Sequence, residues 1–167
     1  GRRMTRLIAI FFGAGLLRPA PGTWGTAAAL PVGWVIHGLF GFPGLVIATI
    51  LAFALGWWAT AVETQGKADH DPSEIVIDEV VGLWIALMPL SAGLSHAGAD
   101  PWLFPWPGWL GAFVLFRLFD IWKPWLVGWA DRRGDALGVM LDDVMAGAFA
   151  AIILALAAGV SHGMLGV

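Results

Sequence analysis

The chain has 167 residues, of which 59% are hydrophobic and only 13% are charged, and it contains 11 tryptophans and 23 glycines. This composition is far from that of a soluble domain and predicts a membrane protein. Nine Lys and Arg residues without a basic stripe argue against nucleic-acid binding, and the lack of cysteine excludes disulfides and thiolate chemistry. No polar linker or low-complexity tract divides the sequence, so we expect a single domain over residues 1–167.

The first apolar run, residues 7–17, follows several arginines and is too short to cross a bilayer. A signal peptide would need a small-residue cleavage site after this run, but Arg18 and Pro19 interrupt the sequence there. We therefore expect a short interfacial or re-entrant helix.

The next segment, RPAPGTWGT at 18–26, combines prolines and glycines with two threonines. Proline removes a backbone donor and glycine admits left-handed backbone, so we expect a loop here and not regular helix. The segment is either a plain turn or an anion-binding loop at a helix N-terminus. In the second case Thr23, Thr26 and free amides would receive phosphate oxygens.

Five apolar segments of membrane-spanning length follow in the chain. The predicted spans are 24–42, 44–62, 75–94, 109–130 and 139–160, with a polar loop at 64–74 and a Trp- and Pro-rich loop at 91–109. The expected fold is thus an all-α bundle of about five transmembrane spans plus the short N-terminal helix. With a cytoplasmic N-terminus, every Lys and Arg lies in an inner segment or within the fourth span, as the positive-inside rule requires.

Two of these spans begin with a pair of acids, Asp78 and Glu79 in the third and Asp142 and Asp143 in the fifth. An acid at membrane depth costs about 2.5–3.5 kcal/mol on insertion scales, so it is normally kept for a cation, a proton or a substrate. An acid pair in the first helical turn can also serve only the helix dipole.

The repeated pattern favours a shared site, because a glycine follows each acid pair, Gly82 and Gly147, where two helices can approach closely. The predicted topology puts both pairs at the cytoplasmic end of the bundle. We therefore expect the two acid pairs to meet.

The fourth span carries Arg117, Asp120 and Lys123 at intervals of three, which places them over one side of a helix. They are either a structural ion-pair ladder or part of the same site. Pro124 would loosen the backbone pairing at Asp120, which is tolerated where a helix lines a polar cavity.

Carboxylates without cysteine suit a hard cation such as Mg²⁺, and the neighbouring cations suit a phosphate. The chain has no P-loop and no Asp-x-Asp nucleophile pair of the kind used by aspartyl-phosphate enzymes, since Asp69 and Asp71 lie beside His70 in the polar loop. Metal-assisted hydrolysis is the reaction class that remains. We interpret His37, His96 and His162 as interfacial or loop residues without an assigned role, and His70 as solvated surface.

The segments APGTWGT, IVIDE, FRLFDIWKPW and GVMLDDVMAG resemble, in order and spacing, the motifs of the phosphatidylglycerophosphatase A family. The resemblance implies a Mg²⁺-dependent phosphatase of the bacterial inner membrane that converts phosphatidylglycerophosphate to phosphatidylglycerol at the cytoplasmic face. Its implied partners are the phospholipid substrate and membrane lipids, and no oligomeric state is predicted. In place of a Gly-Gly-x-Gly run found in many members, this chain has GDALG at 134–138.

On this basis each acid and base receives an expected role. Asp120 would position or deprotonate water, with Asp78 and Lys123 as further catalytic candidates. The expected metal ligands are Glu79, Asp142 and Asp143, supported by Asp78. The expected phosphate-binding residues are Arg117, Lys123, Arg132, Thr23 and Thr26.

Two other classes of function compete with this one. A small ion-coupled transporter would use the buried acids to carry protons or Na⁺, but the outer halves of the predicted spans carry no ionisable side chain. A non-catalytic membrane subunit would use the ion pairs only to hold its bundle together, and would show no metal dependence.

Overall fold

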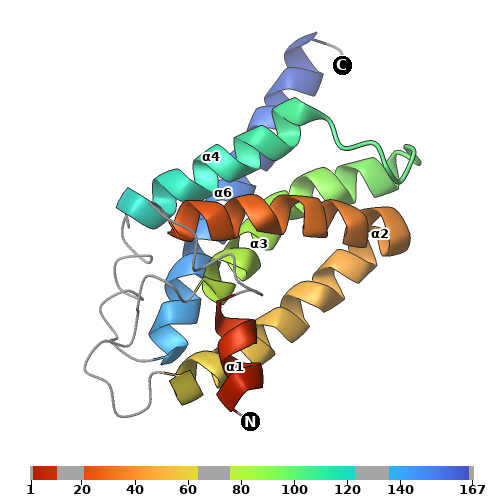
Figure 1. The fold of residues 1–167 in the computed structure, drawn as a ribbon. Coiled ribbons are helices and arrows are strands. Elements are labelled where there is room, and N and C mark those ends of the chain that lie inside the picture. The colour runs from red at the N-terminus through yellow and green to blue at the C-terminus, as the bar shows by residue number, and fades with distance from the viewer. Residues whose placement is uncertain (1, 11–20, 64–75, 123–135, 166–167) are drawn as a thin grey trace.

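In the computed structural model, residues 2–10, 21–63, 76–122 and 136–165 are described, and all of their regular structure is helical (Figure 1). This confirms the all-α class for that part of the chain. The helices, labelled as in Figure 1, are α1 (Arg2–Ala9), α2 (Pro21–Glu63), α3 (Ile77–His96), α4 (Trp106–Trp122) and α6 (Ala136–Leu165).

Within these helices, three stretches are long and apolar enough to cross a membrane: Gly25–Val62, Ile77–His96 and Met140–Gly159. Large apolar side chains on the outside, such as Ile50, Ile121 and Leu156, are 62–70% exposed, as bilayer-facing residues are expected to be. These findings support a membrane protein. The count of about five spans stays a prediction, because it requires both arms of α2 and the 17-residue α4 to cross as well.

Helix α2 is bent where the sequence predicts a break between two spans. Gly41 has φ 70° and ψ −163°, a backbone conformation that glycine adopts without strain, and Pro43 follows two residues later. The backbone N–H of Phe42 donates to Ser95 Oγ of α3 at 3.2 Å, which satisfies a donor released by the bend. Beyond Gly41 the chain turns back, so α2 consists of two arms (Figure 1).

The predicted loop at 18–26 is wrong over residues 21–26, because α2 already begins at Pro21. Proline is favoured at the first helical position, where a missing N–H removes no hydrogen bond. Gly25 also serves packing here, since a Cβ at this position would lie 2.7 Å from Val76 Cβ at the start of α3.

Other predicted boundaries shift by a few residues. Helix α1 begins at Arg2 and not at 7, and α3 continues to His96, so residues 91–96 are helical and not part of a loop. Helix α4 begins three residues earlier than expected, and α6 extends beyond 139–160 at both ends.

His37 is not an interfacial residue, as the sequence had suggested. Its side chain is only 2% exposed, and its Nδ1 lies 2.6 Å from Oγ of the buried Ser91. The pair links the first arm of α2 to α3. His96 is exposed at the end of α3, His162 lies in α6, and His70 is outside the described residues.

Helix α3 is the centre of the bundle and packs against α2, α4 and α6. It is the most buried candidate span, with 56% of its apolar window buried against 33% for α6 and 11% for α2. Aliphatic side chains such as Val80, Leu83 and Leu87 form its core contacts, and the Trp84 indole N–H donates to the Ala29 carbonyl of α2 at 3.0 Å.

Helices α3 and α6 cross in backbone contact at Gly82 and Gly147. A Cβ on Gly147 would collide with the Gly82 carbonyl oxygen and lie 3.1 Å from its Cα, and a Cβ on Gly82 would lie 2.7 Å from the Asp143 carbonyl oxygen. The predicted close approach is thus confirmed. Each glycine lies one helical turn after an acid, Asp78 in α3 and Asp143 in α6, so the crossing brings these acids together.

We expect Gly147→Ala to destabilise the protein by about 1–3 kcal/mol, because the added methyl group forces the two backbones apart. The thermal midpoint in detergent measures this. Gly159→Ala is the matched control in the same helix, since a Cβ there meets open space and alanine favours helix by up to about 1 kcal/mol. Equal midpoints for the two variants would contradict a tight crossing.

Candidate metal and phosphate site

Five carboxylates from three helices converge at one end of the bundle. Helix α3 contributes Asp78 and Glu79, α4 contributes Asp120, and α6 contributes Asp142 and Asp143. Oxygens of Asp78, Asp142 and Asp143 lie within 4.8 Å of one another, and so do oxygens of Glu79, Asp120 and Asp143. The prediction that the acid pairs meet is confirmed, and Asp143 belongs to both groups.

The first group is deeply buried, with Asp78, Asp142 and Asp143 only 5%, 2% and 1% exposed. Among the residues that the structure describes, neither carboxylate oxygen of Asp143 has a hydrogen-bond donor. Two unit charges 4.8 Å apart repel by about 3.5 kcal/mol at an effective dielectric constant of 20, so ionised acids this close need positive charge nearby. Oxygen ligands at this spacing fit a hard divalent cation.

The second group already has a cation. Arg117 donates from Nη1 to Asp120 Oδ2 at 2.8 Å, and the same nitrogen lies 3.5 Å from Glu79 Oε1. The other oxygen of Glu79 accepts a hydrogen bond from Thr26 Oγ1 at 3.1 Å. Glu79 therefore connects α2, α3 and α4.

This second group is less buried than the first. The Arg117 side chain is 18% exposed, and those of Glu79 and Asp120 are 13% and 12% exposed. A guanidinium has five donors, and both of these contacts are made by one nitrogen, Nη1. Arg117 is thus held in place by two acids through one of its nitrogens.

The remaining expected site residues are only partly described. Thr23 lies in the first turn of α2, three residues before Thr26, and its side chain is not described. Lys123 and Arg132 lie outside the described residues, so their roles stay predictions. Thr26 is completely buried, and its hydroxyl group contacts a carboxylate.

Sequence reasoning missed how α1 and α2 enclose the site. The Val76 N–H donates to the Ala9 carbonyl at 2.9 Å, so the end of α1 lies against the start of α3, next to Asp78 and Glu79. Gly25 marks the contact of α2 with the same point. The sequence GTWGT at 22–26 held a sign of this contact, because its second glycine, Gly25, is required by packing and not by a turn.

Comparisons with known proteins agree on one family. The family model of Phosphatidylglycerophosphatase A matches residues 7–158. A Phosphatidylglycerophosphatase A of Haemophilus influenzae is 37% identical over 149 residues, which is 89% of this chain and 85% of the relative. A protein of the same name from Escherichia coli is 34% identical over 149 residues, covering 89% and 80%.

A third relative, from Bacteroides thetaiotaomicron, has the provisional name phosphatidylinositol-3-phosphatase. It is 36% identical over 155 residues, which is 90% of this chain and 91% of the relative. No solved structure matches the chain.

We expect the thermal midpoint of the wild-type protein to be higher with a divalent cation than with EDTA. A ligand that binds only the folded state raises the free energy of unfolding by about 2.7 kcal/mol when its concentration is 100 times its Kd. Asp143→Asn should lose most of this shift, since Asp143 belongs to both acid groups. Asp100→Asn is the matched control: Asp100 is exposed and accepts the Trp102 N–H through Oδ1, as an amide oxygen also can. If the cation raised the thermal midpoint of Asp143→Asn as much as that of the wild-type protein, Asp143 would not be part of the cation site.

Proposed function

This chain belongs to the phosphatidylglycerophosphatase A family and is a phosphatase, and we propose that it hydrolyses the terminal phosphate of phosphatidylglycerophosphate to give phosphatidylglycerol. We further propose that the reaction depends on Mg²⁺ and takes place at the cytoplasmic face of the bacterial inner membrane. The observation that carries the proposal is the meeting of the buried Asp78, Asp142 and Asp143 beside Arg117.

The proposed metal ligands are Asp78, Asp142 and Asp143. Their oxygens are close enough to share one ion, and both oxygens of Asp143 lack a hydrogen-bond donor among the described residues. Mg²⁺ held there would supply Lewis-acid polarisation of the phosphoryl group. Glu79 remains a candidate ligand through the second acid group, although Arg117 and Thr26 already contact its two oxygens.

Arg117 is proposed to bind the phosphate. A guanidinium can grip phosphate with two parallel hydrogen bonds, and such charge-assisted bonds are the stronger kind. Glu79 and Asp120 hold its Nη1, so the remaining donors are oriented before substrate arrives. Lys123, Arg132 and Thr23 are proposed to complete the phosphate site on the basis of the family resemblance, and Thr26 to fix Glu79.

Asp120 is proposed to orient the attacking water or to take its proton. It is within reach of the acid cluster, because one of its oxygens lies within 4.8 Å of Asp143. Arg117 engages Oδ2, which leaves the carboxylate turned in a defined direction. A positioned carboxylate of this kind typically contributes 10²–10⁴-fold to a rate.

The proposed orientation rests on the end of the bundle at which the site lies. Helix α1 carries Arg2, Arg3 and Arg6, and its Ala9 carbonyl binds the Val76 N–H at the start of α3. The arginine-rich end of the chain is therefore close to the acids. By the positive-inside rule this end faces the cytoplasm, where the substrate's phosphate is accessible. The named relatives are phosphatases, and no observation favours an ion-coupled transporter.

The direct test is phosphate release from phosphatidylglycerophosphate by purified protein in detergent, with Mg²⁺ and with EDTA. We expect release with Mg²⁺ only. Asp142→Asn should lower kcat by about 100- to 1,000-fold while the protein stays folded, because several kcal/mol of transition-state stabilisation are lost. Asp100→Asn should retain wild-type turnover. Full activity in EDTA would contradict the metal dependence. Full activity of Asp142→Asn would show that Asp142 is not part of the site.

Arg117→Lys separates charge from geometry. Lysine keeps the positive charge but lacks the planar fork, so we expect kcat/KM to fall by about 10- to 100-fold, the equivalent of one charge-assisted hydrogen bond. Steady-state kinetics on folded protein measures the effect. Unchanged kcat/KM would show that Arg117 acts only as a structural counter-ion for Glu79 and Asp120.

A further inference from the structure

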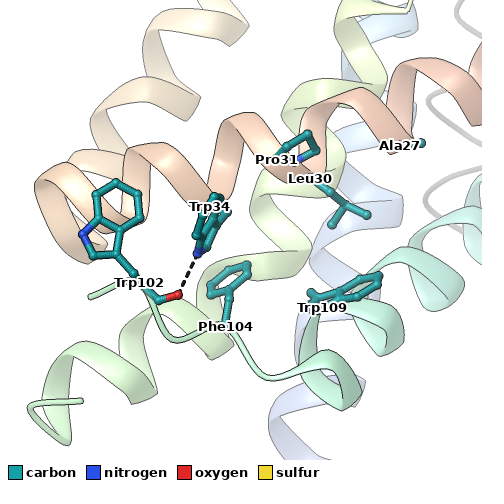
Figure 2. A pocket seen from close by; sticks show the side chains of 7 residues that line it. All are labelled: Ala27, Leu30, Pro31, Trp34, Trp102, Phe104 and Trp109. Carbon is teal, nitrogen blue, oxygen red and sulfur yellow. Dashed lines mark hydrogen bonds between the residues drawn. The ribbon is translucent and has the colours of Figure 1, made fainter. Parts of the chain in front are cut away.

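A groove of about 420 Å³ lies between the first arm of α2, the loop 97–105 and the start of α4 (Figure 2). This volume is in the range of small-molecule sites. Ala27, Leu30, Pro31 and Trp34 of α2 form one side, and Trp102, Phe104 and Trp109 form the other. None of these seven described residues has a charged side chain.

The aromatic wall of the groove is held in place by contacts of its own. The Trp34 indole N–H donates to the Trp102 carbonyl at 2.9 Å, and the two rings meet edge to face with centroids 5.2 Å apart. Gly38 permits this packing, since a Cβ there would collide with the Trp102 ring. The polar atom of Trp34 is thus used internally, and the ring presents an apolar surface to the groove.

One end of the groove lies one residue along α2 from a residue that contacts the acid site. Ala27 directly follows Thr26, which hydrogen-bonds to Glu79, and Glu79 pairs with Arg117. From Ala27 the lining residues follow α2 for seven positions to Trp34, about 10 Å along a helix axis, toward the bend at Gly41. On the opposite wall, Trp109 lies two turns before Arg117 on α4.

The groove is also open to the outside of the bundle. Trp34 and Trp102 are 37% and 44% exposed, and the α2 arm is part of a candidate membrane span. A ligand could therefore enter from the bilayer. A charged ligand would lose its water here and meet no charged side chain among the described lining residues, whereas a hydrocarbon chain has no bound water to lose.

We propose that this groove binds one acyl chain of the phospholipid whose phosphate lies at Arg117 and the acid cluster. The proposal rests on the proposed function, because the position of the bound phosphate determines where the acyl chain of the lipid enters the groove. A lipid held in this way has its headgroup at the end of the bundle and its chain along α2 into the bilayer. The acyl chain and the phosphate of the lipid are then bound by separate parts of the protein.

Filling the groove tests the proposal. Ala27→Leu adds bulk to the groove and keeps a good helix former. Its matched control, Ala48→Leu, fills a second apolar hollow of about 480 Å³ near the bend in α2, away from the acids. The substrates are dipalmitoyl phosphatidylglycerophosphate and its deacylated, water-soluble headgroup.

We expect Ala27→Leu to raise KM for the dipalmitoyl substrate about tenfold more than for the deacylated headgroup, with little change in kcat. Ala48→Leu should keep the wild-type KM and kcat on both substrates. An equal change on the two substrates, or no change on either, would overturn the acyl-chain assignment.

A second measurement separates this proposal from the proposed function. Phosphatidylglycerol with a photoreactive group at the end of one chain is cross-linked to the wild-type protein, and the labelled peptides are identified by mass spectrometry. We expect label at Trp34, Trp102 or Trp109, several-fold reduced in Ala27→Leu and unchanged in Ala48→Leu. If no phosphate is released but this labelling pattern is observed, the proposed reaction is wrong and the acyl-chain assignment of the groove is supported. Label spread evenly over the apolar surface would overturn the groove.

Discussion

The backbone contact between Gly82 and Gly147 joins the central helix α3 to α6. In a bilayer, helices gain little from burying apolar side chains against one another, so close backbone packing at small residues becomes decisive. Here the contact lies one turn after Asp78 and one turn after Asp143. The same crossing that joins α3 to α6 therefore determines the spacing of the buried carboxylates.

Charge balance divides the site into two parts. Arg117 lies between Glu79 and Asp120, and these three side chains from α3 and α4 form the less buried part. Asp143 lies deeper, with both oxygens lacking a donor among the described residues. A buried ionised carboxylate without a donor costs several kcal/mol, and the proposed cation would offset this cost.

The sequence predicted the meeting of the acid pairs better than it predicted the helix boundaries. Acids are so costly within an apolar span that their positions suggested a shared cluster, and the glycine after each pair indicated the crossing. In contrast, residues 21–26 were misread because proline and glycine have two uses: Pro21 begins a helix, and Gly25 makes room for Val76. His37 was misread because its partner, Ser91, was assigned to a loop, and only tertiary structure brings the two together.

The first arm of α2 connects the polar and apolar requirements of a lipid phosphatase. Its Thr26 contacts Glu79 of the acid cluster, while Ala27, Leu30, Pro31 and Trp34 line an apolar groove that opens to the outside of the bundle. A phospholipid need not leave the bilayer to react in such an arrangement, because only its phosphate has to reach Arg117. On the proposed assignment, selectivity for a lipid over a soluble phosphate would come from the apolar groove, and the buried acids would serve the chemistry.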